Sequence, residues 1–112
     1  MGDTLRLPIE GAEVLFMVVS TTNFHTIDNV DVEVILDDGS RWSGSFLTLS
    51  AIDEIMRRRE GTGEALSGTF FQCHDAVIVR RAGVPAMLEV VKGMVTHGMI
   101  QNRLVRLSDE ED

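Results

Sequence analysis

The chain has 112 residues, 44% of them hydrophobic and 25% charged, which predicts one domain over residues 1–112 with no room for a second core. Its single cysteine excludes an intrachain disulfide. The formal net charge of −8 disfavours binding to nucleic acid and suits a basic protein partner. The acids are concentrated at the start, because residues 1–47 carry a balance of −6 and residues 48–108 carry +2.

The first 20 residues bear on where the protein resides. They contain Asp3, Glu10 and Glu13 with a single arginine, which is not the composition of a signal peptide. The longest apolar run, Val14–Val19, falls far short of the roughly 20 residues that cross a bilayer. We therefore expect a cytoplasmic protein without a membrane segment.

The first elements are expected in the following order. Residues 1–12 contain Pro8 and Gly11 and indicate a mostly extended lead-in. Residues 13–20 are rich in valine and short enough for a buried strand. The polar stretch 21–25 then indicates a loop.

The clearest local signal is a hairpin around Asp38-Gly39. Apolar residues alternate with polar ones on both sides of this turn, as in half-buried strands. A three-residue loop over 37–39 places Val34 opposite Trp42 and gathers the apolar side chains on one face, whereas a two-residue loop mixes the faces. We predict the three-residue loop, with Gly39 in the left-handed conformation. The other face then carries Asp31, Glu33, Arg41, Ser43 and Ser45, with Ile35 as an exception.

Helix signals dominate the second half of the chain. A helix is expected from Ser50 or Thr48 to the glycines at 61 and 63, and another from Pro85 to His97. Between them, residues 69–80 predict two short strands in preference to one bent strand. Residues 99–107 predict a last strand, and residues 108–112 an acidic tail that frays. The predicted fold class is α+β, with a mainly antiparallel sheet of four to six strands and two helices packed on one face.

Cys73-His74-Asp75 combines the residue types of a catalytic triad. Neighbours on a strand point to opposite faces, so this spacing does not bring the thiol to the imidazole. A small enzyme built on these three residues stays an alternative, although we expect a protein that is not an enzyme. The three histidines lack a metal-ligand spacing, and no cofactor is expected.

The stretch from Val34 to Val79 carries an unusual block, Gly63-Glu64-Ala65-Leu66-Ser67-Gly68-Thr69-Phe70-Phe71. Asp38-Gly39-Ser40-Arg41 and Phe46-Leu47-Thr48 precede this block, and Asp75-Ala76-Val77-Ile78-Val79 closes it. Together they resemble an uncharacterised family of small bacterial α+β proteins with a G-E-x-L-x-G-x-[FY]-F motif and no assigned activity. The resemblance implies that Glu64, Gly68, Phe71 and Asp75 share one structural or binding feature.

The favoured function is a protein-binding module with an acidic face, of the inhibitor or immunity type, for a basic partner. The residues expected to bind are Asp31, Glu33, Asp37 and Asp38, followed by Glu64 and Asp75. A structural subunit that forms a homodimer through an exposed strand edge is the remaining alternative.

Overall fold

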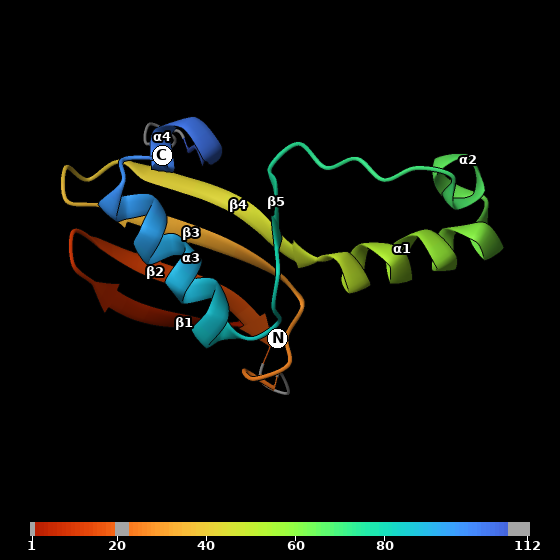
Figure 1. Ribbon diagram of the computed structural model, residues 1–112, viewed down its shortest axis with the longest axis horizontal. Coiled ribbons are helices and arrows are strands. Elements are labelled where there is room, and N and C mark those ends of the chain that lie inside the picture. Colours follow the sequence, from red (N-terminus) through yellow and green to blue (C-terminus); the bar gives the residue numbers. More distant parts are fainter. Residues whose placement is uncertain (1, 20–22, 108–112) are drawn as a thin grey trace.

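The computed structural model describes residues 2–19 and 23–107. The strands are β1 (Gly2–Ile9), β2 (Ala12–Val19), β3 (Asn29–Leu36), β4 (Arg41–Thr48), β5 (Ala76–Val79) and β6 (Val105–Arg106), and the helices are α1 (Leu49–Thr62), α2 (Glu64–Gly68), α3 (Val84–Thr96) and α4 (Ile100–Arg103). The α+β prediction is confirmed (Figure 1). The expected acidic tail at 108–112 lies outside the described residues, as does part of the expected loop at 21–25.

The sheet is mainly antiparallel, as predicted. Its strands run in the order β1-β2-β3-β4-β5, and only the β4–β5 pair is parallel. The strand β6 also pairs with β4, where Trp42 and Ser43 lie opposite Arg106 and Val105. One side of β4 is therefore shared, with β5 along its C-terminal half and β6 along its N-terminal half.

Most of the expected lead-in at 1–12 belongs to β1, which is a strand of the sheet. Ile9 pairs with Ala12 across the turn at Glu10-Gly11, and β1 forms one edge of the sheet. The sequence does contain the alternating pattern of a strand here, because Leu5, Leu7 and Ile9 alternate with polar residues or proline. Pro8 lacks a backbone N–H, which makes this edge a poor template for another strand.

The predicted hairpin register is confirmed. Val34 lies opposite Trp42, and Val32 lies opposite Gly44. The backbone N–H of Leu36 donates to the carbonyl oxygen of Ser40 at 2.9 Å, which leaves residues 37–39 as the loop. Gly39 has φ +87°, the left-handed conformation that such a loop requires at this position.

The core lies between the sheet and α3, which covers one face (Figure 1). On the helix, Met87 and Val91 are fully buried and Met94 nearly so, and Leu88, Val90 and Val95 pack against the core at its margin. The sheet contributes to this core the buried side chains of Ala12, Val14, Phe16, Val18, Val30, Val32, Val34, Trp42, Phe46 and Val79. The prediction that the second helix packs on one face of the sheet is therefore confirmed.

The helix α1 does not lie on the sheet as expected. It continues from the end of β4 and projects away from the sheet, with α2 at its far end (Figure 1). Thr48 is the N-cap, since its Oγ1 accepts a hydrogen bond from the backbone N–H of Ala51 at 3.1 Å, and Ser50 is inside the helix. The C-cap is Gly63, whose N–H donates to Arg59, and Gly61 is helical.

We call α1, α2 and the segment 69–75 the arm, because this segment returns from α2 to the sheet (Figure 1). Of the two strands expected in 69–80, only β5 forms. Residues 99–107 contain α4 and the short β6 instead of one continuous strand. The helix α4 places Ile100 in the core, where it is 1% exposed.

Candidate functional site

The face of the sheet opposite α3 is the candidate site. We call it the open face, and it carries Met17, Asp31, Glu33, Arg41, Ser45 and Asp75. Alternation along β2, β3 and β4 places the first five there, because their neighbours in sequence fill the core. Asp31 and Arg41 are exposed and Met17 is 40% exposed, so the face is accessible to a partner.

Two acidic side chains from distant parts of the chain meet on this face. The hydroxyl of Ser45 lies 3.0 Å from Oδ1 of Asp31 and 3.1 Å from Oδ1 of Asp75. The main chain holds the same junction, because the N–H of Ser45 donates to the carbonyl oxygen of Asp75 at 2.9 Å. The parallel pairing of β4 with β5 thus places Asp75 beside Asp31, although the two residues belong to separate sequence motifs.

Ser45 is a residue of the candidate site that the sequence did not single out. It was placed on the polar face of the hairpin, but its link to Asp75 depends on the β4–β5 pairing. Nothing in the sequence predicted that residues 45–48 and 76–79 would lie side by side.

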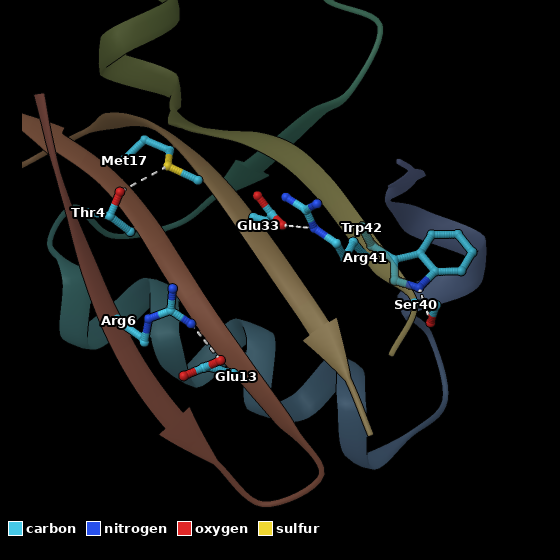
Figure 2. Close-up of polar contacts among 8 residues, drawn as sticks. All are labelled: Thr4, Arg6, Glu13, Met17, Glu33, Ser40, Arg41 and Trp42. Atoms are coloured by element: carbon cyan, nitrogen blue, oxygen red, sulfur yellow. Dashed lines mark hydrogen bonds and ion pairs between the residues drawn. The ribbon is translucent and has the colours of Figure 1, made fainter. Parts of the chain in front are cut away.

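Glu33 differs from the exposed acid that the sequence predicted. It is 6% exposed and forms an ion pair with Nε of Arg41, which lies on the next strand (Figure 2). A second ion pair on the same face joins Arg6 to Glu13 at 2.7 Å (Figure 2). The two arginines of the first 47 residues therefore neutralise acids locally, and Glu33 is not an accessible carboxylate for a partner.

Asp37 and Asp38 lie at the tip of the β3–β4 hairpin, where both are exposed. Asp38 accepts hydrogen bonds from the hydroxyl and the backbone N–H of Ser40, at 2.6 and 2.9 Å. The side-chain hydrogen bond from Ser40 is the main reason that the pKa of Asp38 is lowered from its ordinary value. These two acids are separate from the Asp31–Asp75 pair, so the predicted residues form two acidic positions instead of one.

The resemblance grouped Glu64 and Gly68 with Phe71 and Asp75, and the structure places them in two regions. Glu64 is exposed at the end of the arm, where its carboxylate contacts the hydroxyl of Thr62 at 3.1 Å. Gly68 is buried, and Phe71 lies beneath the guanidinium of Arg59, 5.9 Å from its ring centre. Asp75 belongs to the open face, so the four residues do not form one site.

The thiol of Cys73 is exposed and contacts Oδ1 of Asp75 at 3.3 Å. Among the described residues, no histidine makes a hydrogen bond with this thiol. The arrangement therefore gives the alternative Cys73-His74-Asp75 enzyme no geometric support.

No group of three metal-binding side chains occurs within residues 2–19 and 23–107. Over the same ranges, no helix has the length and apolarity needed to cross a membrane. Comparison with family models, curated proteins and solved structures found no match. The suspected membership of the bacterial family thus stays a prediction, and the case for function rests on the open face itself.

Proposed function

We propose that the protein is a cytoplasmic, non-enzymatic binding module whose open face receives basic side chains of another protein, as in an inhibitor or immunity-type protein. One observation carries the proposal. The Ser45 hydroxyl contacts two carboxylates but has a single proton to donate. The thiol of Cys73 is a further side-chain donor, and it contacts Asp75 at 3.3 Å.

Acceptors therefore outnumber donors at the centre of the open face. Two ionised carboxylates offer about eight acceptor positions, and an arginine guanidinium can donate to both oxygens of one carboxylate at once. In the free protein, water satisfies the remaining positions of Asp31, which is exposed. A basic side chain that replaces this water gains charge-assisted hydrogen bonds with both acids.

The wider charge distribution supports the same kind of partner. The first 47 residues carry a balance of −6, and Glu10, Asp37 and Asp38 are exposed at one end of the sheet. Such an excess accelerates association with a basic surface, and added salt slows it. The carboxylates of the open face would then fix the orientation of the complex.

The test is a comparative capture from the native lysate. The tagged wild-type chain, the Asp31→Asn/Asp75→Asn double variant and the control Glu89→Gln are immobilised, and retained proteins are identified by mass spectrometry. Glu89 is 72% exposed on α3, so the control removes a carboxylate from another surface. We expect one basic protein that wild type and control retain at low salt and that the double variant loses.

The outcomes separate a specific site from general acidity. Loss of the basic protein from the control as well would show that net charge, and not the open face, retains it. Equal retention by all three chains, or no retained basic protein, would overturn the proposal. Circular dichroism of each variant confirms that the fold is intact before the comparison.

A further inference from the structure

The arm carries an apolar side chain that its own chain leaves uncovered. We propose that the arms of two copies pair antiparallel, with Leu66 of each copy inserted into the cleft at the base of the other arm. Leu66 is 75% exposed at the end of the arm. The partner is thus a second copy of this chain, and the pairing surface is distinct from the open face.

The cleft lies where α1 leaves the sheet and has a volume of about 810 Å³. Leu49 and Ile78 line it, and they are 70% and 57% exposed. Asp28, Ser50 and Arg80 supply its polar rim. An aliphatic side chain such as leucine fits this combination, because it would cover both exposed apolar residues and leave the rim in water.

The backbone around Leu66 is held in an unfavourable conformation. Ala65, Leu66 and Ser67 have φ values of 51°, 52° and 60°, so α2 is one left-handed turn. This conformation has a free-energy cost for a non-glycine residue, because Cβ lies too close to the carbonyl oxygen that follows it. Burial within the chain does not offset this cost at Leu66, which the turn directs into solvent. Burial of Leu66 in a second copy would offset it.

The order of charges along α1 is self-complementary. Asp53 lies in the first half and Arg57 in the second, and both are exposed, with an ion pair of 2.9 Å between them. A two-fold axis across the helix at residue 55 would place Asp53 of each copy opposite Arg57 of the other. The same operation would bring Glu64, two residues before Leu66, towards Arg80 in the cleft of the second copy.

Under two-fold symmetry, the two Leu66 contacts form at the same time, one at each end of the paired arms. A two-fold axis that exchanges the ends of α1 brings each arm end to the base of the other arm, so the Leu66 contact forms twice. Pairing through the edge strand β1 is less favourable, because Pro8 cannot donate to a neighbouring strand. The arm therefore replaces the strand edge as the expected surface of a homodimer.

Charge-swap variants test the register of the pair. Sedimentation velocity is measured on the full chain at increasing concentration for wild type, Asp53→Lys, Arg57→Glu, their equimolar mixture and the double variant. Wild type should dimerise, and each single variant should dimerise at least about tenfold more weakly, because like charges then face each other twice. The mixture and the double variant should recover the dimer, since opposite charges face each other again.

A second variant tests the apolar contact. Leu66→Asn removes the apolar side chain and introduces a residue that tolerates positive φ, so the monomer should keep its stability while the dimer weakens at least about tenfold. Met17→Ser on the open face is the control and should leave the dimer unchanged. A monomer at every concentration, or a dimer that none of the arm variants weakens, would overturn the proposal.

Discussion

The indole Nε1–H of Trp42 donates a hydrogen bond to Oγ of Ser40 at 2.9 Å (Figure 2). Ser40 in turn donates its hydroxyl proton to Asp38, so one buried serine joins the hairpin tip to the core. The guanidinium of Arg106 lies 5.6 Å from the Trp42 ring centre and brings β6 into the same cluster. The tip of the hairpin is thereby fixed relative to the core and to β6.

Ser40→Ala should lower the free energy of unfolding by about 1–3 kcal/mol, because it leaves the buried indole N–H of Trp42 without its acceptor. Urea denaturation followed by tryptophan fluorescence gives this value. Ser43→Ala on the adjoining strand β4 is the matched control, and it should change the free energy by no more than about 0.5 kcal/mol. Equal losses in the two variants would contradict the role given to Ser40.

Asp38 makes a contribution to stability that depends on pH. Its folded pKa lies below the ordinary value of 3.8, first because of the Ser40 side-chain hydrogen bond. The contribution is therefore fully present above pH 3.8 and is lost as the pH falls through the folded pKa. Carbon-detected NMR titration should show a lowered pKa in wild type and a value nearer the ordinary one in Ser40→Ala. An unchanged pKa in the variant would argue against this cause.

Gly68 and Gly61 should respond to alanine in opposite ways. A Cβ on Gly68 would overlap the carbonyl oxygen of Met56, and its φ of +80° also disfavours a side chain. Gly68→Ala should therefore lower the free energy of unfolding by at least about 2 kcal/mol. Gly61 is helical with open space around it, so Gly61→Ala should raise the same quantity by about 0.5–1 kcal/mol. Denaturation of the two variants and of wild type measures whether each substitution lowers or raises the free energy of unfolding.

Glu33 and Asp31 occupy the same strand and face but should have different roles. Glu33→Ala removes a buried acceptor from Arg41 and should cost about 1–3 kcal/mol in unfolding free energy. Asp31→Ala should change that free energy by less than about 0.5 kcal/mol, because Asp31 is exposed. The comparison would fail if Asp31→Ala destabilised the chain as much as Glu33→Ala does.

The hairpin was predictable because its register depends on local alternation. Once one face must be apolar, Val34 can lie opposite Trp42 only with a three-residue loop, and the structure agrees. The capping of α1 was only partly predictable, because Thr48 and Ser50 are both good N-cap residues. Only the backbone geometry at the end of β4 distinguishes them.

The arm and the acidic pair were beyond the reach of local patterns. The apolar positions of α1 indicate that one face of the helix packs against other residues. The sequence does not show that the segment 69–75, and not the sheet, packs against it. Left-handed Leu66 contradicts its intrinsic preference, and only the flanking glycines hint at the turn. The meeting of Asp31 with Asp75 requires the parallel β4–β5 pairing, which is a tertiary contact.

Carboxylate footprinting tests the central claim most directly. The protein is treated with carbodiimide and glycine ethyl ester in buffer and in its native lysate, and modification at each acid is quantified by mass spectrometry. Asp31 and Asp75 should be protected in the lysate, while the exposed Glu89 of α3 should react equally in both. Unchanged reactivity at Asp31 and Asp75, or the same protection at all three acids, would contradict recognition through the open face.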